Sequence, residues 1–203
     1  MKYQGIKHII TVCLGVCTLI ACNDNLEIAP PSSIIPEDYL KEESQLDSYI
    51  INRYTGLPNS GGGVGLDNGT DNEAGMDFST KYTDGDWKVG ETGGEWNFEE
   101  IYQLNYFLDR VLPMYQNGEI SGSKENIEHY IGEAYLLRAV AYYNKLVSLG
   151  DFPIVRHTFV DDKQQLTEAS KRMPRNEVAR FIISDLDSAA VLMKSTAPDG
   201  KKN

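Results

Sequence analysis

The sequence predicts an all-α fold made of helical hairpins and interrupted by one long irregular loop. Three observations favour this fold class. Apolar residues recur every three or four positions over four long stretches, which is the period of an amphipathic helix. Between these stretches there is no convincing run of alternating residues that would predict a strand. The hydrophobic share of 41% is typical of a chain that folds around a core.

The charge of the 203-residue chain excludes one class of partner. There are 19 Lys and Arg residues against 30 Asp and Glu residues, which gives a net charge of −11. Affinity for nucleic-acid phosphate comes from lysine and arginine side chains that displace counterions. The sequence therefore predicts that the protein does not bind nucleic acid.

The first 21 residues have the pattern of a secretory signal peptide. A start with two lysines precedes an apolar run at residues 9–20, which is too short to span a bilayer of ~30 Å. The exit, Leu19-Ile20-Ala21-Cys22, resembles the lipobox of bacterial lipoproteins. That resemblance implies cleavage before Cys22 and lipidation of its thiol, and two or more acyl chains would anchor the protein durably.

The other cysteines agree with lipidation. Cys13 and Cys17 lie inside the predicted signal peptide, so Cys22 would have no disulfide partner in the secreted product. A free thiol at Cys22 is the alternative. Residues 22–35, which include Pro30 and Pro31, then predict an extended tether, because proline stiffens the backbone and blocks a helix.

The four helical stretches are expected at residues 37–54, 96–115, 123–149 and 176–193. Ser123 is a candidate N-cap for the third, and Gly150 is its expected stop. Residues 152–160 are at most a short extended piece. The predicted buried faces include Leu46 and Ile50, then Tyr102, Phe107 and Val111, then Tyr142 and Val147, and last Phe181, Leu186 and Ala190.

A Gly- and Asp-rich loop is expected at residues 58–94, which hold ten of the chain's 18 glycines. A loop of this length in a compact domain is usually functional or disordered. Sugar-binding sites pair a flat aromatic ring with amides and carboxylates. This part of the chain supplies such a set, and the candidate ligand-binding residues are Tyr82, Asp86, Trp87, Trp96 and Asn97.

Other roles for this region stay open. Its rings could pack on the helices for stability, which is the favoured interpretation for Trp96. Three acids, Asp67, Asp71 and Glu73, carry oxygen ligands that suit calcium, but they do not match the EF-hand spacing.

No motif in the sequence predicts catalysis, a cofactor or a metal site. His129 and His157 lie far apart without cysteines or acids at zinc-site spacing, and His129 is expected to be a solvated histidine on a helix. Glu99 and Glu100 are adjacent on a predicted helix, so they point in different directions and make a poor acid–base pair for a glycosidase. We therefore expect a binding protein and not an enzyme.

The third helical stretch carries the strongest resemblance. Gly132-Glu133-Ala134-Tyr135 is similar to the Gly-x-x-Tyr element of tetratricopeptide repeats. The longer run GEAYLLRAVAYY at residues 132–143, followed by GDFPIV at 150–155, closely resembles the signature helix of the SusD/RagB-like family. Supporting positions are Trp96, Tyr102 and Asn105 in the second stretch and Arg175, Val178 and residues 182–189 in the fourth.

The resemblance implies a function and a location. Members of this family are surface nutrient-binding lipoproteins that cap TonB-dependent transporters of the SusC type in the outer membrane. The chain would then be anchored there through Cys22, capture a glycan or oligosaccharide and pass it to the transporter. The alternative is a helical interaction scaffold that docks on the transporter without contacting the ligand.

The resemblance also bears on domain organisation. Such proteins are usually much longer, with a C-terminal part that folds over the helices. Residues 36–203 are therefore expected to be the N-terminal helical portion of a larger SusD-like fold. Within it, Glu133 and Arg138 are expected to have structural roles at helix contacts.

Overall fold

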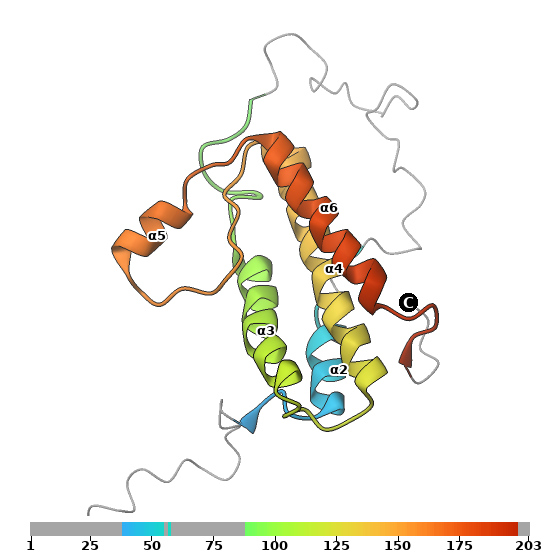
Figure 1. Ribbon diagram of the computed structural model, residues 1–203. Coiled ribbons are helices and arrows are strands. Elements are labelled where there is room, and N and C mark those ends of the chain that lie inside the picture. The colour runs from blue at the N-terminus through green and yellow to red at the C-terminus, as the bar shows by residue number, and fades with distance from the viewer. Residues whose placement is uncertain (1–37, 55–56, 58–87, 199–203) are drawn as a thin grey trace, which may run out of the picture. The chain divides into compact units, whose positions relative to one another are not determined.

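The computed structural model describes residues 38–54, 57 and 88–198. In this part of the chain there are five helices and, apart from two isolated bridges, no strand pairing. The helices are α2 (Glu43–Ile51), α3 (Glu99–Gln116), α4 (Lys124–Leu149), α5 (Lys163–Ala169) and α6 (Arg175–Leu192) (Figure 1). The predicted all-α fold class is confirmed, whereas the tetratricopeptide-type pairing of hairpins stays a prediction.

Several predicted features lie outside the described residues. These are the signal peptide, Cys22, the tether at residues 22–35 and most of the loop at 58–94. The chain divides into the units Met1–Tyr39 and Leu40–Asn203, and the helices described here belong to the second. No described helix has both the length and the hydropathy that a membrane crossing requires.

The longest helix has the predicted limits, although the side chain of Ser123 makes no capping hydrogen bond. Ser123 is the residue before α4, and Gly150 follows it with a φ of 74°, a left-handed value that glycine adopts without strain. By contrast, α2 begins six residues later than the predicted start at residue 37. Leu40 has a φ of 68° and a fully buried side chain, so the chain turns there before the helix can start.

The helix α5 was not expected from the sequence. It is seven residues long, and its N-cap Asp162 accepts a hydrogen bond from the backbone N–H of Gln165 at 2.8 Å. None of its residues is buried, and it projects away from the other helices (Figure 1). About two turns with only two apolar residues, Leu166 and Ala169, are too short to show an amphipathic period in the sequence.

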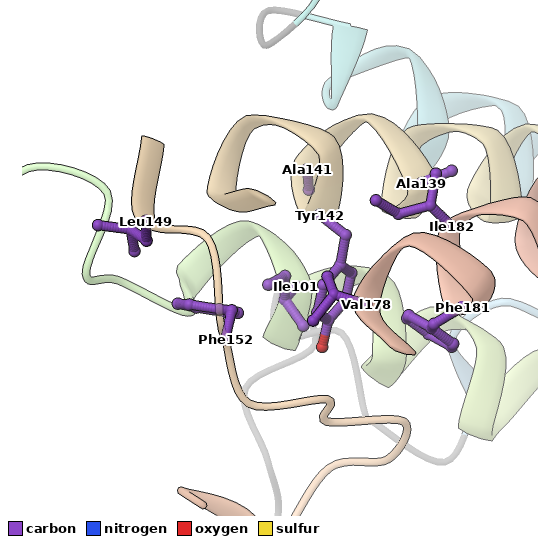
Figure 2. Packing of buried hydrophobic residues seen from close by; sticks show 9 residues of the cluster. All are labelled: Ile101, Ala139, Ala141, Tyr142, Leu149, Phe152, Val178, Phe181 and Ile182. Atoms are coloured by element: carbon purple, nitrogen blue, oxygen red, sulfur yellow. The ribbon is translucent and has the colours of Figure 1, made fainter. Parts of the chain in front are cut away.

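The core forms where α4 packs on α3 and α6, and Tyr142 lies between Ile101 of α3 and Val178 of α6 (Figure 2). Helix α4 closely approaches the end of α6 at Gly132, where an added Cβ would lie 2.7 Å from Cγ of Met193 and 3.1 Å from Cβ of Leu192. The main cluster consists of Ile101, Ala139, Ala141, Tyr142, Leu149, Phe152, Val178, Phe181 and Ile182.

Some residues predicted to be buried are exposed. The exposed fractions of Tyr102, Val147 and Leu186 are 53%, 61% and 41%, and Ala190 is exposed as well. The prediction is wrong at these positions because the apolar stripe on each helix is wider than the surface that its neighbours cover.

His129 is buried, so the prediction of a solvated histidine is wrong. Its Nδ1 accepts the backbone N–H of Lys194 at 2.9 Å, which places the proton of the neutral ring on Nε2, 3.2 Å from Oε1 of Glu133. Glu133 also accepts a hydrogen bond from the hydroxyl of Tyr54, and burial together with this carboxylate raises the pKa of Tyr54. The sequence shows polar neighbours beside His129 but not the chain after α6 that covers it.

Candidate binding site at the loop end of the bundle

Most of the described residues that lie outside helices are found at one end of the bundle. We call it the loop end: residues 88–98 and 150–174, with the first turns of α3 and α6 and the last turn of α4 (Figure 1). The antiparallel contacts of α4 with α6 and α3, such as Tyr142 with Phe181, bring these termini together. Three cavities open here among the described residues.

A buried ion pair holds the helices in register beneath this end. Nε and Nη2 of Arg138 on α4 donate to the two carboxylate oxygens of Asp185 on α6, at 2.8 and 2.9 Å. Nη1 of Arg138 donates to Oδ1 of Asn105 on α3 at 2.8 Å. Arg138 and Asp185 are 5% and 3% exposed, so the pair links three helices inside the core. The expected structural role of Arg138 is confirmed.

The same network fixes the backbone of the segment after α4. The backbone C=O of Val155 accepts hydrogen bonds from Nδ2 of Asn105 at 2.9 Å and from the hydroxyl of Tyr142 at 3.0 Å. That hydroxyl in turn accepts the N–H of Val155 at 2.8 Å. Burial raises the pKa of the Tyr142 phenol to about 12, so the hydroxyl keeps its proton at neutral pH.

Asp109 continues this anchoring one turn further along α3. Its carboxylate contacts Nδ1 of His157 at 2.7 Å and accepts the N–H and hydroxyl of Thr158 at 2.7 and 3.0 Å. Residues 155–158 are therefore held in place, and the chain leaves the bundle only after Thr158. We call residues 159–171, which include α5, the arm.

An apolar cavity of about 340 Å³ lies between α3 and the arm. Tyr102 and Phe159 line it and remain 53% and 38% exposed, so their rings are accessible to a ligand. His157 and Ser170 contribute polar groups to the lining. Sequence analysis missed this site because Tyr102 fits the apolar period of α3 and the arm has no periodic signal.

A second cavity, of about 570 Å³, lies between the end of α4 and the start of α6. Asp151, Arg172 and Arg175 contribute to its lining, together with the apolar side chains of Val89 and Leu146. A third, of about 490 Å³, opens on the other side of the start of α6 and has Arg156, Glu177 and Arg180 in its lining.

Trp96 lies at the loop end but in a packed position. Its ring stacks on Phe152 with a centroid distance of 5.6 Å, and the guanidinium carbon of Arg172 lies 5.2 Å from its centroid. Its Nε1 donates to the backbone C=O of Gly90 at 2.6 Å. These contacts give the ring a packing role, which is the interpretation that the sequence favours.

Asn97 is exposed at the same end, where its Nδ2 donates to the C=O of Gly94 at 3.2 Å. Lys145, which is buried, contacts Glu95 at 2.6 Å and Oδ1 of Asn97 at 3.4 Å. The other candidate residues, Tyr82, Asp86 and Trp87, lie outside the described residues and stay predictions. No cluster of three or more His, Cys, Asp or Glu side chains in the described part of the chain is arranged to hold a metal ion.

The fold and this site define an all-helical protein with aromatic and basic cavities at one end. No family model matches the chain. Two curated proteins of Formosa agariphila are similar to it along nearly its whole length. SusD-like protein P25 is 24% identical over 214 residues, which cover 96% of this chain and 39% of that protein. SusD-like protein P2 is 25% identical over 203 residues, which cover 94% of this chain and 39% of that protein.

These comparisons confirm the resemblance to the SusD-like family that residues 132–155 indicate. The chain spans only 39% of the length of the two relatives. Their similarity therefore bears on the helical portion and not on a complete binding protein.

Proposed function

We propose that this chain is a helical portion of a SusD-like lipoprotein that captures a glycan at the cell surface and passes it to a TonB-dependent transporter of the SusC type. The observation that carries the proposal is the similarity to two SusD-like proteins over 96% and 94% of the chain. Lipidation of Cys22 would anchor the protein at the outer membrane. The proposal assigns the protein no catalytic step.

The loop end supports a binding role. The apolar faces of sugar rings bind flat aromatic side chains, while polar groups fix their orientation. Tyr102 and Phe159 offer accessible rings beside the His157–Asp109 pair, on backbone that Asn105 and Tyr142 hold in place. Preorganised side chains lose little entropy when a ligand binds. Tyr82, Asp86 and Trp87 are proposed as further contacts.

A panel of oligosaccharides, measured by isothermal titration calorimetry against the chain, tests the proposal. Replacing Tyr102 and Phe159 with alanine should abolish binding of the ligand found. Tyr143→Ala is the matched control, because Tyr143 is a 57% exposed tyrosine on α4 outside the cavity linings. If no glycan binds the chain at any concentration, capture by this portion is refuted.

An interaction scaffold is the second candidate function. Tyr143 and Val147 on α4, and Ile183 and Leu186 on α6, are apolar and between 41% and 61% exposed. Exposed apolar groups of this kind often mark a protein contact. If Tyr143→Ala weakens docking on the transporter and Tyr102→Ala leaves it intact, the scaffold function gains support.

A further inference from the structure

The start of α6 is basic in a chain that is otherwise acidic. Residues 171–180, which we call the basic segment, contain Lys171, Arg172, Arg175 and Arg180 against one acid, Glu177. The whole chain carries 30 acidic and 19 basic residues. Lys171 is paired with Glu168 at 2.5 Å, so the arginines are the cations that remain for a ligand.

Arg172 is held in position at the cavity of about 570 Å³. Its Nε donates to the backbone C=O of Asp151 at 3.0 Å, and its guanidinium lies over the ring of Trp96. Within the described residues, its Nη groups form neither a hydrogen bond nor an ion pair. The fork of this guanidinium is therefore oriented and free to bind an anion.

Arg175 lines the same cavity, and within the described residues neither Arg172 nor Arg175 forms an ion pair. The only acid in this lining is Asp151, and its Oδ1 accepts the backbone N–H of Arg175 at 2.8 Å. That bond satisfies an open N–H in the first turn of α6, and the carboxylate offsets one of the two arginine charges. The cavity thus presents two guanidinium groups and one carboxylate, and the charge of its lining is positive.

A second pair of arginines lies across the start of α6. Arg156 and Arg180 line the cavity of about 490 Å³, and the guanidinium of Arg156 lies 4.4 Å from the ring centroid of Phe181. Glu177 in that lining offsets one of the two charges. Two arginines and one acid line each of the two cavities, so positive charge continues on both sides of α6. Arg172 differs from the others because a hydrogen bond and the ring of Trp96 orient its guanidinium.

We propose that the ligand captured at the loop end is an acidic glycan, whose carboxylate or sulfate groups bind Arg172 and Arg175. This inference rests on the proposed function and names its substrate class. The guanidinium fork matches the geometry of both anions and binds them through paired charge-assisted hydrogen bonds. A net charge of −11 repels a polyanion at long range, so an acidic glycan needs a local basic surface of this kind.

The test compares three polysaccharides: polygalacturonate for carboxylates, carrageenan for sulfate esters, and laminarin as a neutral glycan. Affinity gel electrophoresis of the chain should show binding to at least one acidic polymer. Raising NaCl from about 0.05 to about 0.5 M should weaken that binding, because salt screens exposed charges. R172Q/R175Q should raise the dissociation constant for the acidic polymer by about tenfold or more, because charge-assisted hydrogen bonds are stronger than neutral ones.

The control variant K124Q/K194Q removes the same charge at the opposite end of the bundle and should bind like the original chain. R172K/R175K keeps the charge but loses the fork, so an intermediate loss supports the proposal if R172Q/R175Q fails to fold. Equal loss in K124Q/K194Q, or unchanged binding in the arginine variants, overturns it.

The neutral polymer separates this inference from the proposed function. If laminarin binds as tightly as the acidic polymers and salt has no effect, the ligand is not acidic and glycan capture still stands. If none of the three polymers binds, the acidic-glycan inference and the proposed glycan capture both fail for these glycan classes. Carboxylate and sulfate are distinguished by which acidic polymer responds to R172Q/R175Q.

Discussion

Removing the carboxylate of Asp185 tests how the bundle supports the loop end. Asp185 is 3% exposed, and both of its oxygens accept hydrogen bonds from Arg138. Asp185→Ala leaves that guanidinium buried without its counterion. Removing one partner of a buried ion pair typically lowers the free energy of unfolding by about 3–5 kcal/mol. We expect the lower part of this range, because Arg138 keeps its hydrogen bonds to Asn105 and to the C=O of Arg156.

The assay is urea unfolding followed by far-ultraviolet circular dichroism. Asp187→Ala, an exposed change on the same helix, is the control and should shift stability by no more than about 0.5 kcal/mol. The double variant Arg138→Met with Asp185→Leu removes both charges and should cost less than Asp185→Ala alone. A loss of unfolding free energy below about 1 kcal/mol for Asp185→Ala would refute the reasoning. So would a double variant whose loss equals the sum of the losses in Arg138→Met and Asp185→Leu measured singly.

Two further predictions concern packing and pH. Gly132→Ala should destabilise the fold by about 1 kcal/mol or more, because overpacking against Met193 and Leu192 outweighs the gain in helix propensity. Thermal unfolding measures this change. The folded protein should lose stability between pH 10 and 12, by up to about 1.4 kcal/mol per pH unit, because the unfolded Tyr142 phenol ionises near 10.0 and the buried one near 12. Tyr142→Phe should flatten this part of the curve, as measured by urea midpoints across pH.

Opposite results in these measurements would contradict the packing and burial described for Gly132 and Tyr142. A higher melting temperature for Gly132→Ala would mean that α4 and α6 have room at this position. An unchanged slope above pH 10 in Tyr142→Phe would mean that the phenol is not protected from solvent. Tyr54, whose pKa is also raised, is expected to leave part of the slope in place.

Helix positions could be predicted from the sequence where the signal is local. The end of α4 follows from Gly150 and the apolar period before it. At its start, Ser123 stands at the predicted N-cap position, but its side chain makes no capping bond, and its N–H donates to the distant carboxylate of Glu43 at 2.8 Å. The start of α2 depends on the left-handed backbone at Leu40, and a leucine in a sequence does not predict a positive φ. The helix α5 depends on one capping aspartate, Asp162. It also depends on flanking segments that are bonded to the rest of the protein, at Thr158 before it and at Met173 after it.

The candidate site was less predictable, because its parts come from distant segments. The residues of the Arg138–Asp185 pair are 47 positions apart, and neither one identifies the other in a sequence. The sequence makes Trp96 a candidate ligand-binding residue, but only the fold shows its ring packed between Phe152 and Arg172. Composition averaged over the acidic chain also conceals the basic segment.

The arm is fastened at its base and not along its length. On one side Asp109 binds His157 and Thr158, and on the other the backbones of Phe152 and Met173 bond to each other at 3.2 and 3.1 Å. Residues added to or removed from the arm would leave this base, and the core under it, unchanged. Changes in the arm can therefore alter one wall of the cavity that Tyr102 and Phe159 line while the helices keep their packing. Related proteins could change the ligand they recognise in this way with little loss of stability.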